Sequence, residues 1–191
     1  EYAYRVSGAG FWQVHAKGPS LLVESVLAAA EAQPGETVVE LYSGAGLLTR
    51  PLADAVGPGG RVESVESSTE AVRDARRNLH DSPQVRLHTG DVARALASGL
   101  PVRADAVVLD PPRAGAGPAV MTALCDAAPG RIVYVACDPA ALARDLRTCE
   151  DRGYVLSGLQ ALDLFPHTHH VECVALLEPS SESVDGRAGR A

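Results

Sequence analysis

The sequence predicts one α/β domain with a mostly parallel β-sheet, and three observations support this fold class. The chain has 191 residues, of which 46% are hydrophobic, so it can bury one sizeable core but is short for two typical domains. Short apolar runs alternate with helical stretches along most of the chain. Because such alternation is typical of parallel strands joined by helices, we expect helices on both faces of the sheet.

Five apolar runs rich in Val and Leu predict the parallel strands. They are 37–42, 61–66, 84–88, 104–110 and 131–136. The segments between and after them have helical composition and spacing, namely 47–56, 68–80, 92–98, 117–127 and 139–152. One amphipathic helix, 19–33, is expected to pack over the sheet, and "YAYRV" at 2–6 is strand-like.

Two last strands are predicted at 154–165 and 170–179. The short "PHTH" link between them cannot hold a crossover helix, so the two strands must run antiparallel. Five parallel strands followed by a hairpin with a reversed last member resemble the seven-stranded methyltransferase variant of the Rossmann fold. We expect residues 1–179 to form the catalytic domain, and 180–191, which are small, polar and aperiodic, to form a disordered tail.

Composition excludes several classes of protein. No apolar run approaches the roughly 20 residues that span a bilayer, and the N-terminus lacks a basic region before an apolar core, so we expect a cytoplasmic protein without a membrane partner. The formal net charge of −7 argues against a stand-alone polyanion binder. The four cysteines show no CxxC spacing, which disfavours a zinc knuckle or a disulfide framework. The chain begins with Glu rather than Met, and we expect it to be a piece of a longer polypeptide.

The stretch "ELYSGAG" predicts a nucleotide-binding turn. It places Gly44 and Gly46 directly after the first strand, where backbone can approach a ligand at a helix N-terminus. Glu66 ends the second strand about 20 residues later, where dinucleotide-type sites place an acid on ribose hydroxyls. Thr49 occupies the position of the third Rossmann glycine, which disfavours a pyrophosphate and favours S-adenosylmethionine. Asp91 either accepts a hydrogen bond from the adenine amino group or caps the next helix, and both interpretations stay open.

The reactive end of the sheet is predicted where the fourth and fifth strands finish. Asp110 opens "DPPR" and Cys137 opens "CDPAALARD", so both should flank one crevice. Asp138 is placed to cap the following helix, which leaves Cys137 outside the positive end of that helix and favours a thiolate. An ionised Asp138 would push the thiol pKa upward, and the sequence does not decide between the two effects. The other cysteines lie within predicted elements, where packing explains them.

Glu172 should reach the same crevice, because the reversed last strand begins at the sheet edge where its predecessor ends. A carboxylate there can act as a base. Three histidines, His167, His169 and His170, lie just before it. Structural hydrogen bonding explains them better than a metal, because no second ligand cluster is visible, and we predict no metal site.

The residues resemble those of the uracil-5-carbon RNA methyltransferases, which make 5-methyluridine in tRNA and large-subunit rRNA. The matching motifs are "FWQVH", "ELYSGAG", "VESVESSTEAVRDARRN", "LDPPRAG", "VYVACDPAALARDL" and "DLFPHTHHVECVALL". The resemblance implies that S-adenosylmethionine contacts Gln13, Tyr42, Glu66, Asp91 and Asp110. It also implies that Cys137 is the nucleophile and Glu172 the base.

Some positions depart from the family pattern. His15 and Asp138 replace asparagines, Ser43 replaces a cysteine, and Leu47 removes a polar side chain. The family's N-terminal RNA-binding barrel, and the cysteine cluster that some members use for an iron–sulfur centre, are absent from this sequence. We therefore expect a monomer whose RNA substrate is gripped with help from such a missing domain. Two other functions remain open, an amino-group methyltransferase that uses Asp-Pro-Pro and a non-catalytic cofactor-binding domain.

Overall fold

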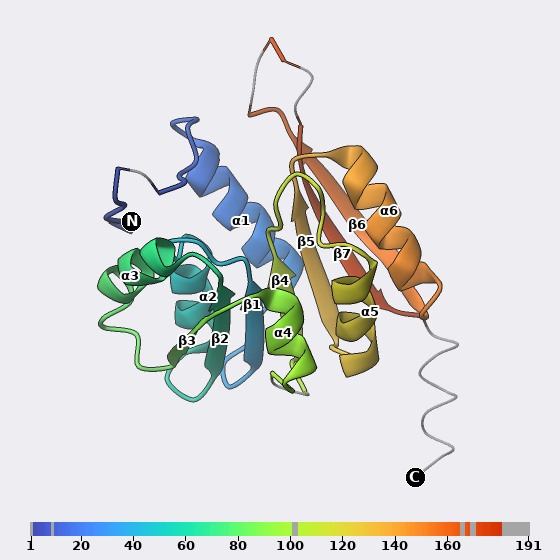
Figure 1. Cartoon of the computed structure of the whole chain (residues 1–191), viewed down its shortest axis with the longest axis horizontal. Helices are drawn as coiled ribbons and strands as arrows, with labels where there is room; N and C mark the ends of the chain where they lie inside the picture. The colour runs from blue at the N-terminus through green and yellow to red at the C-terminus, as the bar shows by residue number, and fades with distance from the viewer. Residues whose placement is uncertain (1, 9, 101–102, 165–166, 169–170, 181–191) are drawn as a thin grey trace.

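The structure is a computed structural model that describes residues 2–8, 10–100, 103–164, 167–168 and 171–180. The helices are α1 (Gly18–Ala30), α2 (Thr49–Val56), α3 (Thr69–Asn78), α4 (Val92–Ala97), α5 (Pro118–Ala127) and α6 (Pro139–Glu150). The strands are β1 (Thr37–Leu41), β2 (Arg61–Glu66), β3 (Val85–Thr89), β4 (Ala106–Leu109), β5 (Arg131–Ala136), β6 (Tyr154–Leu162) and β7 (Glu172–Pro179). The predicted fold class is confirmed, because these strands form one sheet with helices around it (Figure 1).

The sheet has the order β3-β2-β1-β4-β5-β7-β6. The first five strands pair in parallel, and β7 runs antiparallel to both of its neighbours. Although β7 is the last of these strands in the sequence, it is inserted between β5 and β6. This arrangement confirms the predicted reversal of the last strand.

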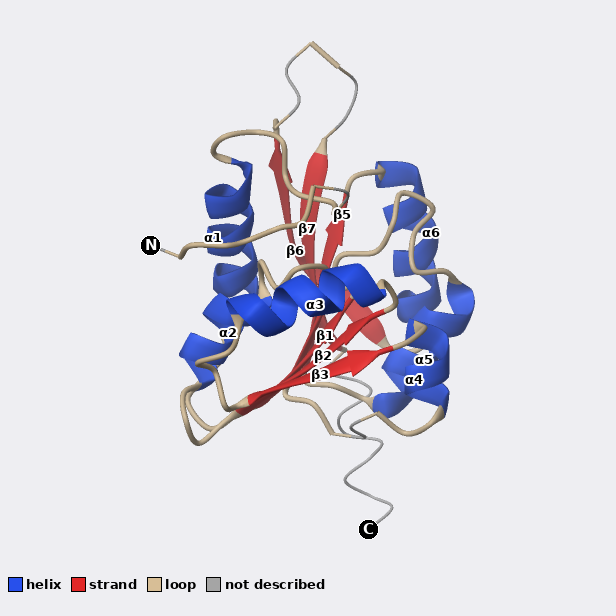
Figure 2. Cartoon of the chain, turned by 60° about the vertical axis from the view of Figure 1, so that its left-hand side comes forward, coloured by secondary structure: helices blue, strands red, loops and turns tan. Residues whose placement is uncertain are grey.

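Helices cover both faces of the sheet, as Figure 2 shows, with α1 and α2 on one side and α4, α5 and α6 on the other. Leu22, Val26 and Leu52 pack with strand residues on the first side. Met121, Leu124 and Leu142 pack with strand residues on the second side. The central strands β4 and β5 are almost entirely buried and rich in apolar residues, as expected for parallel strands covered on both faces.

Local capping fixes where several helices begin. Asp138 caps α6 by accepting a hydrogen bond from the Ala141 amide, as the sequence predicts, and Pro139 occupies the first helical position. Ser68 caps α3 in the same way. Both caps lie just after the end of a strand, at the edge of the sheet where a cavity opens.

The strand-like segment 2–6 is not a strand, and this prediction was wrong. Its polar groups bind side chains and loops instead of a neighbouring strand: Arg5 exchanges main-chain hydrogen bonds with the Asn78 side chain, and the Tyr4 hydroxyl donates to the carbonyl of Leu47. The other predicted elements are found with end shifts of a few residues.

Ser180, the first residue of the predicted tail, donates its amide to the carbonyl of Gly153. Residues 181–191 lie outside the described part of the chain, so the tail stays a prediction. Among the described residues, the longest helices fall short of what a membrane crossing needs in length and apolar character.

Candidate active site

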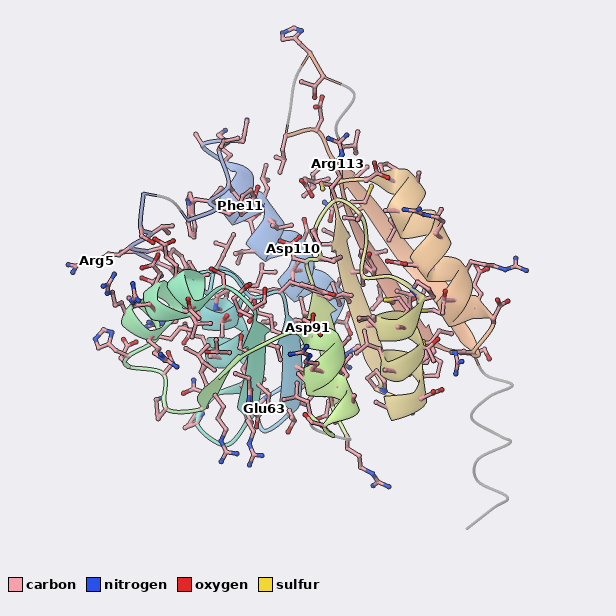
Figure 3. All side chains as sticks on the ribbon, in the orientation of Figure 1. Arg5, Phe11, Glu63, Asp91, Asp110 and Arg113 are labelled. Atoms are coloured by element: carbon pink, nitrogen blue, oxygen red, sulfur yellow. The ribbon has the colours of Figure 1, made fainter. Side chains whose placement is uncertain are left out.

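A cavity of about 660 Å³ opens at the carboxyl ends of β1, β2, β4 and β5. The sequence-predicted residues that line it are Gln13, Tyr42, Gly44, Glu66, Asp110, Cys137 and Glu172. Figure 3 shows Phe11, Asp110 and Arg113 around this end of the sheet, whereas Glu63 lies toward the opposite end. The structure therefore brings together residues that are up to about 160 positions apart in the sequence, as expected where parallel strands end.

The glycine turn after β1 has an unusual backbone. Tyr42, Gly44 and Gly46 have φ of 63°, 55° and 93°, a left-handed region that costs a bulky residue energy and that glycine adopts freely. The Glu66 carboxylate supports the turn by accepting hydrogen bonds from the amides of Gly44, at 3.0 Å, and Ser68, at 2.6 Å. Glu66 thus links the two strand ends that face the cavity.

Two predicted cofactor residues do not line the cavity. Gly46 faces the core, where an added Cβ would lie 3.1 Å from the Leu79 side chain. Asp91 accepts a hydrogen bond from the Arg94 amide and caps α4. Asp91 still lies close enough to Tyr42 to help raise the pKa of that phenol, after burial, which is the larger cause. The capping interpretation of Asp91 is therefore confirmed, and its contact with adenine stays a prediction.

The reactive groups meet where β5 and β7 pair. Ala136 of β5 lies opposite Cys173 of β7 in an antiparallel register. Cys137 directly follows this last pair on the β5 side and Glu172 directly precedes it on the β7 side, so continuing the register brings the two residues opposite each other, and the charge of Glu172 acts on the Cys137 thiol. Asp110 follows β4, the other neighbour of β5. Three strands therefore place a thiol and two carboxyl groups on one wall of the cavity.

Burial governs the protonation of this wall. It raises the pKa of Asp110 to about 7, with a further contribution from the charge of Glu172, and it raises the pKa of Glu172. The pKa of Cys137 is raised by burial first and then by the charges of Glu172 and Asp110. The predicted thiolate-favouring corner is therefore wrong for the protein without ligands, because burial and these two charges raise the pKa of the thiol.

The open question about Asp138 is also answered. Amide hydrogen bonds from Ala141 and Ala140 lower the pKa of Asp138, with Arg113 contributing, and the charges that raise the Cys137 pKa are those of Glu172 and Asp110. Neutralising the charges of these two carboxyl groups would lower the pKa of the thiol, although burial, the largest cause of its rise, would remain.

Glu40 is a cavity residue that the sequence reasoning missed. Its side chain is 2% exposed, and it accepts hydrogen bonds from the hydroxyls of Thr49, at 2.5 Å, and Ser64, at 2.7 Å. Burial raises its pKa to about 7 against these two hydrogen bonds, which lower it. A charged residue inside the apolar run "TVVELY" was the signal that could have found it, because buried carboxyls in clefts mark functional sites.

The N-terminal segment forms another wall of the cavity. Asp74 accepts hydrogen bonds from the amide and the hydroxyl of Ser7, and Asn78 bonds both to Arg5 and to the carbonyl of Ala45 in the glycine turn. The Tyr4 and Trp12 rings pack with centroids 5.1 Å apart. Arg5 and Ser7 are thereby held against α3, and Trp12 and Gln13, further along the same segment, line the cavity.

The histidines of the sequence supply no metal site in the part of the chain that the structure describes, which includes His167 but not His169 or His170. There, no three side chains of His, Cys, Asp or Glu are grouped as a metal ion requires.

We expect the buried carboxyl of Glu40 to make the empty protein less stable as the pH rises. In the unfolded chain Glu40 ionises near its ordinary pKa of 4.5, whereas in the folded protein it stays protonated up to about 7. Between these values ionisation favours the unfolded chain, so the free energy of unfolding should fall across this window and level off above it. Denaturant unfolding at pH 5 and pH 7.5 measures this fall. Glu40→Gln should reduce it, and an equal fall in that variant would contradict the assignment; the exposed Glu31→Gln is the matched control.

Comparisons with known proteins agree with this site. Residues 12–134 match the family described as "Methyltransferase small domain", and residues 100–180 match "tRNA (Uracil-5-)-methyltransferase". A Streptomyces avermitilis protein named "Uncharacterized RNA methyltransferase" is 46% identical over 95% of this chain and 42% of its own length. A Bifidobacterium longum protein of the same description is 42% identical over 92% of this chain and 42% of its own length. The chain thus spans less than half the length of these relatives.

A solved structure shows the same fold. The Pyrococcus abyssi tRNA (uracil-54, C5)-methyltransferase, crystallised with S-adenosyl-L-homocysteine, superposes with a TM-score of 0.77 and 33% identity, over 93% of this chain and 42% of that one. The resemblance seen in the sequence motifs is confirmed. Residues 100–180 match the tRNA (Uracil-5-)-methyltransferase family. The match to the methyltransferase small domain family covers more than half of the chain, so the chain belongs to that family.

Proposed function

We propose that this chain is the catalytic domain of an S-adenosylmethionine-dependent RNA methyltransferase that modifies carbon 5 of a uridine in tRNA or rRNA. The observation that carries the proposal is the register of β5 and β7, which brings Cys137 opposite Glu172 at the edge of a cavity. The family matches and the Pyrococcus abyssi structure support the same reaction.

The cavity residues fit S-adenosylmethionine. The acidic groups Glu66, Asp110 and Glu172 suit a ligand with a positive sulfonium, and Glu66 ends β2 where ribose hydroxyls are expected. The buried hydroxyl of Ser43 lines the cavity without a hydrogen-bond partner among the described residues, which leaves it available to a polar ligand. When bound, S-adenosylmethionine supplies an electrophilic methyl group.

Cys137 performs the first step on the RNA. Carbon 5 of uracil is a poor nucleophile, so the thiolate of Cys137 adds to carbon 6, and the electron pair of the carbon 5–carbon 6 double bond moves into an enolate. When S-adenosylmethionine is bound, the activated carbon 5 would take its methyl group, and the electron pair of the broken methyl–sulfur bond would stay on the sulfur of the departing S-adenosyl-L-homocysteine. Since the pKa of the thiol is raised by nearby carboxyl charges, bringing cationic charge to Asp110 and Glu172 favours the thiolate that the addition needs.

Glu172 completes the reaction as the base. After methylation, carbon 5 carries both the new methyl group and its original proton, and the Glu172 carboxylate removes this proton. The double bond re-forms, the bond between carbon 6 and sulfur breaks, and Cys137 leaves as a thiolate. Burial raises the pKa of Glu172, which makes its carboxylate a stronger proton acceptor.

The product identifies the reaction directly. We expect mass mapping of host tRNA and rRNA to find a 5-methyluridine that disappears when the full-length gene is deleted and returns with the gene. An unchanged 5-methyluridine pattern, with loss of a methyl group on an exocyclic amine instead, would support the amino-group alternative.

Glu66 is expected to hold the cofactor through its ribose hydroxyls. Its carboxylate already accepts the amides of Gly44 and Ser68, and the remaining lone pairs can accept hydroxyl donors. Glu66→Ala should weaken S-adenosylmethionine binding by roughly 1.5–3 kcal/mol, the scale of a hydrogen bond to a charged group. Calorimetry measures the affinity, with Glu31→Ala as the control, because Glu31 is exposed and does not line the cavity. An affinity like that of the unmodified protein would remove Glu66 from the cofactor site.

A further inference from the structure

Asp145 is a buried carboxylate that lies within the motif "VYVACDPAALARDL" but has been given no role there and does not line the cavity. It lies in α6 with 4% of its surface exposed. Oδ2 accepts hydrogen bonds from the Ala116 amide at 2.8 Å and from the Tyr134 hydroxyl at 2.6 Å. The Gly117 amide donates to both carboxylate oxygens at 3.2 Å. All of these donors are neutral, and burying a carboxylate is costly unless it is well hydrogen-bonded.

The amides that bind Asp145 belong to the loop that joins β4 to α5. This loop begins with Asp110, and its first four residues, 110–113, line the cavity. Its far end turns through two glycines, since Gly115 and Gly117 have φ of 86° and 82°, and the Gly115 amide closes a turn on the carbonyl of Pro112. The first half of the loop therefore faces the cavity, and the second half rests on α6.

The loop fits Asp145 without spare room. A Cβ added to Gly115 would lie 2.7 Å from Asp145 Oδ2, closer than real side chains approach. The Tyr134 hydroxyl, which donates to Asp145, also accepts the Ala116 amide at 3.0 Å. Tyr134 is fully buried, so the loop backbone is fixed against both β5 and α6.

The same helix positions Cys137, because α6 begins two residues after it. Asp138, the cap of α6, also lies 3.8 Å from the Arg113 guanidinium of the loop. We propose that Asp145 is a positioning residue, which sets the place of the loop 110–117 relative to Cys137 and thereby the place of the target base beside the nucleophile. This inference rests on the proposed function for what the loop holds, but the contact between Asp145 and the loop does not depend on it.

The expected effect falls on the reaction and not on the cofactor. Asp110 is fixed by the pairing of β4 with β1, since its amide donates to the carbonyl of Leu41 at the end of β1, and Glu66 belongs to β2. Loosening the far end of the loop should therefore leave the dissociation constant of S-adenosylmethionine within about twofold. Misplacement of reacting groups by about 1 Å can cost about a hundredfold in rate, so kcat for RNA methylation should fall by about ten- to a hundredfold.

Three variants and one control test the inference in the full-length protein. Asp145→Ala removes all the acceptors, Asp145→Asn keeps one acceptor oxygen in nearly the same shape, and Tyr134→Phe removes only the bridging hydroxyl. Glu150→Ala removes an exposed carboxylate from the end of the same helix. Hydrogen exchange at residues 114–117 should speed up by about tenfold or more in Asp145→Ala, less in Asp145→Asn and Tyr134→Phe, and not in Glu150→Ala, while the amides of β4 stay protected. kcat on unmodified tRNA and rRNA transcripts should follow the same order.

Gly115 offers an independent geometric test. Gly115→Ala places its methyl group against Asp145 and should loosen the loop, whereas in the Asp145→Ala background that clash is gone. The effect of Gly115→Ala on exchange should therefore be smaller in the double variant than in the single one. The left-handed φ of Gly115 strains an alanine in both backgrounds, so only the part of the effect that comes from the contact with Asp145 should disappear, and fully additive effects would contradict the close fit between Gly115 and Asp145.

Two results would overturn the inference. One is faster exchange throughout β4 and β5, with S-adenosylmethionine affinity lost in proportion, which would make Asp145 a general stabiliser of the fold. The other is an unchanged kcat in Asp145→Ala and Asp145→Asn although the loop exchanges faster. Exchange and cofactor binding are measured without RNA, so they still report on Asp145 if Cys137→Ala retains methylation and the proposed function fails.

Discussion

Replacing Cys137 by alanine is expected to abolish methyl transfer to RNA, whereas replacing Glu172 by glutamine is expected to trap the RNA on the protein. Without the thiol, carbon 5 is never activated and no covalent species forms. Glutamine keeps nearly the shape of Glu172 but takes no proton, so addition and methylation proceed while elimination slows by about 10²- to 10⁴-fold. A denaturing gel with labelled methyl donor and cognate RNA should show a labelled adduct in Glu172→Gln of the full-length protein.

The controls separate the thiol of interest from its neighbours. Cys173 follows Glu172 directly in β7 and is buried there. The Cys173→Ala variant should retain methylation. The double variant with Cys137→Ala and Glu172→Gln should form no adduct. Methylation that survives in Cys137→Ala, or an adduct that persists in the double variant, would show that the nucleophile and base are assigned wrongly and would favour the amino-group alternative.

S-adenosylmethionine is expected to bind more weakly as the pH falls below 7. The pKa of Asp110 is raised to about 7 by burial and by the charge of Glu172, so below this pH the empty site holds a neutral carboxyl. A cationic ligand prefers the ionised form, and its binding must then release a proton. The dissociation constant should therefore rise by up to about tenfold for each pH unit below 7, which calorimetry between pH 5 and pH 7 measures together with the proton release.

Two substitutions assign this pH dependence. Asp110→Asn should bind weakly across the range and show a flatter profile, because the titrating group is gone. Glu40 also lines the cavity and has a pKa raised to about 7, so Glu40→Gln shows how much of the slope belongs to it. A slope that Asp110→Asn leaves intact would mean that Asp110 does not meet the charge of the ligand.

Most of the fold could be predicted because its signals are local. The strands at 61–66 and 131–136 were placed with their observed ends, since short Val-rich runs bounded by turn residues are typical of buried parallel strands. The reversal of β7 followed from the length of one connection. The segment 2–6 could not be placed in the same way, because its partners, Leu47 and Asn78, are distant in sequence and act through a carbonyl and a side chain.

The candidate site was predicted in part for a related reason. Residues at strand ends, such as Asp110 and Cys137, share an edge by topology, so their sequence positions suffice. Protonation is different, because the raised pKa of Cys137 depends on burial and on carboxyl groups from two other strands. The role of Asp145 could not be predicted from the sequence either, because it depends on hydrogen bonds from the amides of a loop about 30 residues away.

The position of β7 has a consequence for how the chain folds during synthesis. β7 is made last, yet it fills the place between β5 and β6, so until residues 172–179 leave the ribosome the edge of β5 has no partner and β6 has no sheet to join. Unpaired edges of this kind are where nascent chains associate wrongly. The same eight residues carry Glu172, and the last strand to be translated is therefore also the one that brings Glu172 opposite the thiol. A polypeptide cut short before this point would hold Cys137, a cavity without Glu172 and an open sheet edge, so incomplete copies are expected to be cleared as misfolded protein and not to persist as defective enzymes.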